Sequence, residues 1–303
     1  MEDRQRDGRE IGLAREVGAA SYRALRNAAE LVKPGAKLVD VADAAERFLK
    51  DSGYGAAFPI NLSIGSQAAH YAPSLDDEAI FSDKDVVKVD FGAEKGGVLG
   101  DCALTIDLSG GSQDLVEAAD EALLNAISKT KAGAKVCEIG GEIDRSIRAR
   151  GFVPIRNLGG HSVEVHELHS SVFVPNYDNG DETQLEEGMV VAIEPFATTG
   201  KGLVTESDIC DIYGLSADAT VRSQEARLVL QEIKSRYPHE PFAVRWLSNV
   251  IGSRFGLYAA IAELARAGIL ERYPTLVEVG KGIVAQAEAE VLVGKDGCEV
   301  LTK

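Results

Sequence analysis

The sequence predicts an α/β (α+β) fold made of two related αβ halves, with a helical segment inserted into the domain. A run of helix, helix, loop and hairpin over residues 11–108 is followed by helix, helix, loop and strand over 112–198. Residues 213–275 interrupt this alternation with helical runs, and residues 280–302 return to β character. The halves share no evident sequence identity, so their relation is inferred from element order.

Apolar residues at helical spacing predict four helices in the two halves. The first covers residues 11–33, and Pro34-Gly35 stops it. The other three are expected over 38–51, 112–131 and 136–150. Irregular or extended segments follow each helix pair: 57–73 after the first pair, and 156–176 and 188–198 after the second.

Residues 85–108 read as a β-hairpin, because two apolar β-branched runs flank a glycine-containing tetrad. If Lys95-Gly96 forms the loop, Asp90 lies opposite Asp101 with their Cβ atoms about 5 Å apart. Like charges there destabilise a hairpin unless a bound divalent cation compensates. The alternative is two solvated aspartates on an exposed face. The flanking residues are mostly apolar or small, which favours the metal.

The inserted segment, 213–275, is expected to hold three helical runs, around 226–233, 242–251 and 257–267. The C-terminal segment returns to strands and turns at Lys295-Asp296-Gly297. We therefore expect one catalytic domain over 1–303 that contains a helical, winged-helix-like subdomain.

Composition excludes several classes of protein. With 303 residues and 45% hydrophobic content, the chain can bury a substantial core. A net charge of −16 argues against nucleic acid or an anionic membrane as the main partner. The four cysteines lack CxxC spacing, the N-terminus MEDRQRDGRE is no secretory signal, and no apolar stretch reaches membrane-spanning length. A cytoplasmic protein is expected.

Candidate chemistry gathers in a few residues. Three of the five histidines, His161, His166 and His169, lie in GHSVEVHELH, which favours metal or acid–base chemistry. For His166 a hydrogen bond to loop backbone is the favoured alternative. HExxH, GxSxG and GxxxxGK[ST] motifs are absent, so zincin, serine-hydrolase and P-loop functions have no support.

Two glutamates lie in otherwise apolar strands, where an unpaired charge is unfavourable. Glu194 in VVAIEPF follows four apolar residues and calls for a partner or a metal. Glu288 has Glu290 two residues on, so a solvent-exposed face remains an alternative there.

In order and context, five residues match the metal ligands of methionine aminopeptidases, and the chain resembles that family from about residue 10 to its end. They are Asp90 in KVDFG, Asp101 in GDCALT, His161 in NLGGHS, Glu194 in AIEPFAT and Glu288 in AQAEAE. AFPINLS…AAHYAP and LHSSVFVPN are similar to the segments that carry the family's two other functional histidines, at His70 and His169. The long gap between Glu194 and Glu288 resembles the type II subfamily, and the short N-terminus its archaeal branch. Ala287 and Ala289 depart from the family, which has an aromatic residue and a histidine there.

The resemblance implies a pita-bread metallopeptidase fold and a mechanism. Two divalent ions (Co, Mn, Fe or Zn) would activate water to attack the first peptide bond. Asp101 and Glu288 would be ligands of both ions. Asp90 would complete the ligand set of one ion, and His161 with Glu194 would complete that of the other. His70 and His169 would bind the scissile carbonyl and the adjacent amide. Glu194 would also carry protons, and Phe58 would line the methionine pocket.

The implied substrates are the N-terminal methionine peptides of nascent chains, with the ribosome as a candidate partner and a monomer as the family norm. The nearest rival is an X-Pro aminopeptidase or prolidase of the same fold, which usually carries an extra N-terminal domain. A second rival is a metal-free, non-catalytic binding protein of this fold, although such relatives lose ligands. A third is an acidic scaffold with incidental histidines.

Overall fold

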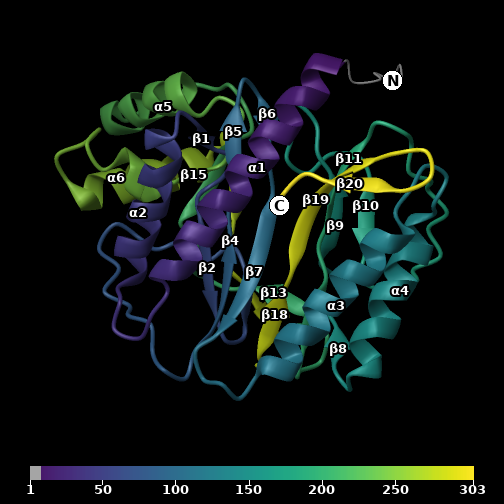
Figure 1. Ribbon diagram of the computed structural model, residues 1–303. Coiled ribbons are helices and arrows are strands. Elements are labelled where there is room, and N and C mark those ends of the chain that lie inside the picture. Colours follow the sequence, from purple (N-terminus) through teal and green to yellow (C-terminus); the bar gives the residue numbers. More distant parts are fainter. Residues whose placement is uncertain (1–7) are drawn as a thin grey trace.

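The computed structural model describes residues 8–303 and contains two αβ halves joined through one sheet (Figure 1). Each half begins with two helices, and the bounds predicted from apolar spacing are confirmed to within three residues. The helices are α1 (Gly8–Leu31) and α2 (Leu38–Asp51) in the first half, and α3 (Gln113–Lys129) and α4 (Val136–Ala149) in the second. Of the MEDRQRDGRE segment, residues 1–7 lie outside the described part.

The main sheet has eight strands, and neighbouring strands are antiparallel at every pairing. Its strands are β2 (Asn61–Ile64), β4 (Val86–Asp90), β7 (Cys102–Asp107), β9 (Gly159–Ser162), β10 (Phe173–Pro175), β11 (Val190–Ile193), β19 (Glu288–Val293) and β20 (Cys298–Val300). Their order is β10-β9-β11-β19-β7-β4-β2, with β20 paired to β19. The order β7-β4-β2 in one half mirrors β19-β11-β9 in the other, which confirms the predicted α/β fold.

Three small sheets complete the two halves. The first has the order β1-β5-β6, the second β18-β12-β8 and the third β13-β17-β3. Their strands are β1 (Gly55–Ala56), β3 (Gln67–Ala69), β5 (Ala93–Lys95), β6 (Val98–Leu99), β8 (Val153–Pro154), β12 (Phe196–Thr198), β13 (Val204–Glu206), β17 (Leu276–Glu278) and β18 (Val284–Gln286). β17 and β18 bring the chain back from the inserted segment to β19.

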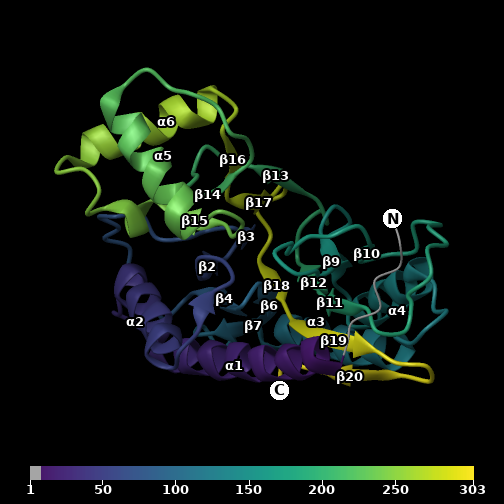
Figure 2. The ribbon, with the colours of Figure 1, turned by 90° about the horizontal axis from the view of Figure 1, so that it is seen from above.

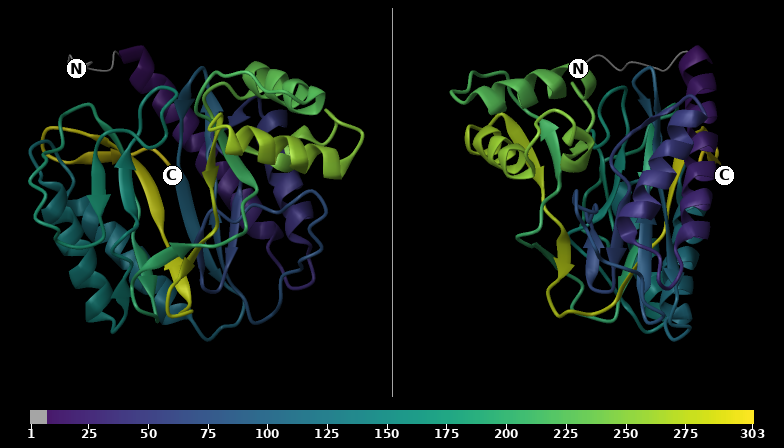
Figure 3. Two further views of the ribbon diagram at one scale, coloured as in Figure 1. Left: turned by 180° about the vertical axis from the view of Figure 1, so that it is seen from behind. Right: turned by 90° about the vertical axis from the view of Figure 1, so that its left-hand side faces the viewer.

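The four helices α1–α4 lie on one side of the main sheet, and the inserted segment lies on the other (Figures 2 and 3). Each helix pair packs its apolar stripe on its own half, through residues such as Val17 and Leu25 in the first and Ile139 and Ile143 in the second. In the described residues, none of the helices is long and apolar enough to cross a bilayer.

The predicted hairpin forms, but its predicted register is wrong by two residues. Asp90 pairs with Ala103 rather than with Asp101, because the turn is Gly96-Gly97. Both glycines have positive φ, 61° and 83°, which suits a tight hairpin turn. A shift of two residues preserves the alternation of side chains between faces, so both aspartates still reach one pocket.

The segment predicted to be helical also contains a small sheet. Its elements are β14 (Ile212–Leu215), α5 (Gln224–Arg236), β15 (Phe242–Ala243), the 3₁₀ helix η1 (Val244–Leu247), α6 (Arg254–Arg266) and β16 (Leu270–Tyr273). The helix expected around 242–251 is wrong, because Phe242 and Ala243 pair with β14 and only one 3₁₀ turn follows. The segment has its own cluster of buried apolar side chains.

A buried ion pair joins the inserted segment to the first half. Arg245 of η1 pairs with Glu46 of α2, and their side chains are only 4% and 13% exposed. The indole N–H of Trp246 donates to the other Glu46 oxygen at 2.7 Å. These contacts fix where the inserted segment lies over the sheet, on the side that holds the pocket described next.

Candidate metal centre

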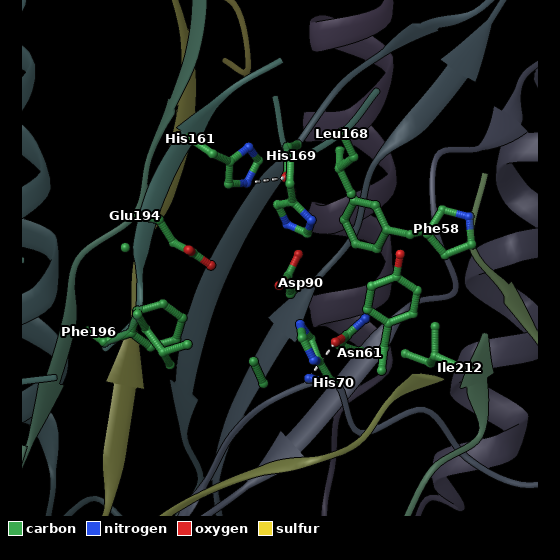
Figure 4. Close-up of a pocket in the computed structure, with 16 residues that line it drawn as sticks. Phe58, Asn61, His70, Asp90, His161, Leu168, His169, Glu194, Phe196 and Ile212 are labelled. Atoms are coloured by element: carbon green, nitrogen blue, oxygen red, sulfur yellow. Dashed lines mark hydrogen bonds and ion pairs between the residues drawn. The ribbon is translucent and has the colours of Figure 1, made fainter. Parts of the chain in front are cut away.

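Strand ends from both halves bring the five predicted ligands together. Figure 4 labels three of them, Asp90, His161 and Glu194. Asp90 ends β4 and Glu194 directly follows β11, the matching strand of the other half. Asp101 directly precedes β7, and Glu288 begins β19, which pairs with β7. His161 lies in β9, next to β11. Ligands separated by nearly 200 residues in sequence therefore meet where the halves join.

The donor atoms form two groups in which all lie within 4.8 Å of one another. One group contains Asp101, His161 and Glu288, and the other contains Asp90, Glu194 and Glu288. Because Glu288 belongs to both, it is placed as a bridging ligand would be. Glu194 lies with Asp90, whereas the resemblance grouped it with His161.

Buried polar atoms in this cluster lack the partners that folded proteins normally supply. Asp90 Oδ1, Asp101 Oδ1, His161 Nδ1 and both carboxylate oxygens of Glu288 are buried without a hydrogen bond to another described residue. Asp101 Oδ2 lies 3.4 Å from His161 Nε2. Oxygen and imidazole donors left over in this way fit divalent cations.

The electrostatics of the cluster agree with that fit. Burial, and then the neighbouring carboxylate of Asp101, raises the pKa of Asp90 well above its ordinary value. Burial and nearby carboxylates raise the pKa values of Glu194 and Glu288 in the same way. Positive charge placed among these groups would remove the penalty that raises each pKa.

Glu290 is fully buried, at 0% exposure, and Glu288 is nearly so. The alternative of a solvent-exposed face at Glu288 is therefore wrong, because β19 is covered by neighbouring elements on both of its faces. Ala287, Glu288 and Ala289 all line a groove between α1 and α3, on the helix side of the sheet. Among the described residues, those that line the pocket bordered by Asp90, Asp101, His161 and Glu194 include none of these three.

His70, His169 and Phe58 border this pocket, which has a volume of about 180 Å³. His70 is half-buried, and removal of its imidazole from water lowers the pKa of the ring to about 4. The ring is therefore neutral near pH 7. His169 is exposed at the rim, with its ring edge-on to His161 at 4.3 Å between centroids. Phe58 is buried and contributes an apolar wall.

His166 lies away from the ligands. Its backbone N–H donates to Gly97 O at 2.8 Å, its Nδ1 lies 3.1 Å from Glu240 Oε1, and its ring packs on His239. The ring therefore contacts a carboxylate and a second imidazole rather than the loop backbone that was expected, and His166 is not among the described residues that line the pocket.

Sequence reasoning missed several pocket residues. Asn61, Leu168 and Tyr273 line the pocket, and Gln286 donates to two of the predicted ligands. Gln286 could have been found, since it lies two residues before Glu288 in an apolar strand. Asn61 carries no comparable signal.

Comparison with known proteins agrees with this geometry. Residues 12–229 match the family described as Metallopeptidase family M24. The methionine aminopeptidase of Thermococcus onnurineus is 43% identical over 288 residues, which cover 95% of this chain and 97% of that protein.

Solved structures agree on the fold. A thermophilic Arx1 superposes with a TM-score of 0.84 at 16% identity, covering 97% of this chain and 91% of that one. The methionine aminopeptidase of Thermotoga maritima superposes with a TM-score of 0.73 at 24% identity, covering 99% of both chains. The chain therefore belongs to metallopeptidase family M24.

Proposed function

We propose that this chain is a methionine aminopeptidase, a metallo-exopeptidase that removes the N-terminal methionine from nascent proteins. The observation that carries the proposal is the convergence of four carboxylates and one imidazole from both halves in one buried cluster, in which Asp90, Asp101, His161 and Glu194 line one pocket. The near full-length identity of 43% to a methionine aminopeptidase supports the substrate class.

Two divalent cations would be held by Asp90, Asp101, His161, Glu194 and Glu288. When bound, they would supply Lewis-acid activation of water at neutral pH. Oxygen donors with one imidazole suit Mn, Fe, Co and Zn alike, so availability decides the metal. The unpartnered buried oxygens of Asp90, Asp101 and Glu288 support this assignment.

The remaining pocket residues would bind and orient the peptide. The neutral ring of His70 and the ring of His169 would hydrogen-bond the scissile carbonyl and the adjacent amide, stabilising charge that develops there. Glu194, at the edge of the cluster, would carry a proton to the leaving amine. Phe58, with Leu168 and Ile212 from other segments, would surround the apolar methionine side chain.

We further propose that the protein acts in the cytoplasm, as a monomer, on chains that emerge from the ribosome. Its substrate class supports the location. Residues 213–275 would form an inserted subdomain that lines the pocket, which is supported by their separate core and by Pro241 and Tyr273 at the pocket wall.

The test is release of methionine from a Met-Ala-Ser peptide by metal-stripped protein, with and without added Mn²⁺ or Co²⁺. We expect release that requires the cation and is lost in Asp101→Asn. The matched control is Asp83→Asn, in the exposed loop before β4, which should keep full activity. Cleavage of an X-Pro peptide alone would reassign the chain to the prolidase group. A folded protein that cleaves neither peptide would favour a binding protein of this fold.

A further inference from the structure

Gln286 lies between two of the predicted ligands that come from different halves. Its side-chain Nε2 donates to Asp90 Oδ2 at 3.1 Å and to Glu194 Oε1 at 2.8 Å. Gln286 is only 1% exposed, so water does not compete for these bonds. Carboxylate oxygens only accept hydrogen bonds, and the amide group offers two hydrogens, one for each carboxylate.

The backbone of Gln286 is fixed independently of its side chain. Its N–H donates to Thr105 Oγ1 at 2.8 Å, and its carbonyl accepts from the same hydroxyl at 2.7 Å. Thr105 belongs to β7, and Gln286 also pairs with Phe196 across β12 and β18. The side-chain amide is thereby presented to the metal centre from a rigid position.

No other hydrogen bond to a described residue accounts for this side chain. Gln286 Oε1 is buried without a hydrogen-bond partner, so the contacts of the Nε2 end are those that orient the amide. Leaving a buried oxygen unpartnered is unfavourable. A glutamine at this position is therefore explained by the hydrogen bonds that its amide nitrogen donates to Asp90 and Glu194.

We propose that Gln286 is a positioning residue that holds Asp90 and Glu194 in the arrangement that accepts divalent cations. This inference rests on the proposed metallopeptidase function. Asp90 and Glu194 are like charges that repel, and the shared amide places both before a cation arrives. Partners of metal-ligating side chains typically change metal affinity by about 10- to 100-fold when removed.

The test is isothermal titration of Mn²⁺ into the metal-stripped full-length protein and its Gln286→Met variant. Methionine has similar length and volume but no donor. We expect about a 10- to 100-fold loss of affinity for at least one of two bound Mn²⁺ ions. The electron paramagnetic resonance signal of a coupled Mn²⁺ pair should weaken at the same Mn²⁺ concentration.

Two controls keep the outcome decisive. Gln67→Met makes the same replacement at a residue whose amide oxygen accepts from Ile64 N–H, and it should leave Mn²⁺ affinity unchanged. If Gln286→Met does not fold, Gln286→Asn keeps the amide but shortens its reach, and the same loss is expected. Wild-type affinity in the folded Gln286 variant would overturn this proposal alone. A wild-type protein that binds no Mn²⁺ would overturn it together with the proposed metal centre.

Discussion

His70 adopts a backbone conformation that non-glycine residues rarely take, with φ of 65°. Asn61 Oδ1 accepts its N–H at 2.7 Å, and Thr275 Oγ1 donates to its carbonyl at 3.3 Å. Asn61 is in turn fixed by its own donation to Pro59 O at 2.8 Å. Neighbouring side chains therefore hold the strained residue with its ring toward the pocket.

Asn61→Ala should lower kcat for methionine release by about tenfold. The reason is that one buried hydrogen bond is worth about 1–1.5 kcal/mol, and about 1.4 kcal/mol corresponds to tenfold in rate. Mn²⁺ affinity should stay at the wild-type value, since the side chain of Asn61 bonds to the backbone of Pro59 and His70, and its backbone pairing with Asp90 is kept in the variant. Steady-state kinetics on Met-Ala-Ser and a Mn²⁺ titration measure the two quantities.

The control for this prediction is Gln67→Ala. Gln67 also bonds to backbone, at Ile64 N–H, but it does not line the pocket. It should leave kcat unchanged. Wild-type kcat in Asn61→Ala would mean that the conformation of His70 does not depend on this hydrogen bond.

At the residue scale, the sequence identified candidate ligands better than the residues that support them. A carboxylate in an apolar strand is noticeable by itself, because its burial needs an explanation. The position of Gln286 in an apolar strand marks it as buried, but it does not reveal what the amide contacts. Its partner Asp90 lies 196 residues away, and only the folded sheet brings the two together.

At the element scale, helix bounds could be predicted because periodicity and the following glycines or prolines are local signals. Hairpin register was harder, since it depends on which two residues form the turn. The backbones of Gly92 and Gly100 also approach each other closely within the hairpin. A Cβ atom on Gly92 would lie 1.7 Å from Gly100 O, so only glycine fits there. Phe242 was misassigned since its strand pairing is a tertiary contact.

The side chain of Glu278, at the end of β17, joins the chain segment that enters the inserted segment to the one that leaves it. Its carboxylate accepts the backbone N–H groups of Lys201 and Gly202, which precede β13. It also accepts the N–H of Gly282, which precedes β18, at 2.9 Å. Burial alone would raise the pKa of Glu278, but these backbone donors outweigh it and hold the pKa below its ordinary value.

Glu278→Gln should destabilise the protein by about 2 kcal/mol near pH 7, the size of a lost hydrogen bond to a charged group. The lowered folded pKa means that ionised Glu278 stabilises the fold above its unfolded pKa of about 4.3. That stabilisation is lost as pH falls through the folded pKa. The difference between wild type and variant should therefore shrink near pH 3, which urea unfolding at both pH values measures.

The matched control is Glu206→Gln, an exposed glutamate in β13 of the same small sheet. It should change the unfolding free energy by less than about 0.5 kcal/mol at either pH. A Glu278→Gln difference that stays constant between the two pH values would contradict the role of the ionised carboxylate.

At the scale of the whole molecule, the proposed metal centre lies on the seam between the halves. Asp90 and Asp101 come from the first half, and His161 and Glu194 come from the second. The order of elements predicted two related halves, yet it could not predict that β7 and β19 pair along the seam. Strand pairing over such separations depends on the packed core of both halves.

A cation bound at this seam would join the two halves, so it should stabilise the whole protein rather than one half. Binding only to the folded chain at about 100 times Kd contributes about 2.7 kcal/mol, which corresponds to a rise of about 5 °C in Tm. Calorimetry of metal-stripped protein with and without Mn²⁺ measures this rise. Hydrogen exchange should slow together in β4, β7, β11 and β19.

The acidic surface, with a net charge of −16, offers a competing reason for cations to stabilise the fold. Asp101→Asn separates the two reasons, because it changes the surface hardly at all while removing one buried ligand. If the cations bind a specific centre, the same Mn²⁺ concentration should raise the Tm of the variant much less than that of the wild type. An equal rise in Tm in both proteins would show that the ions act on the surface, since screening of exposed charge does not depend on Asp101. Protection confined to one half would likewise contradict a ligand set shared across the seam.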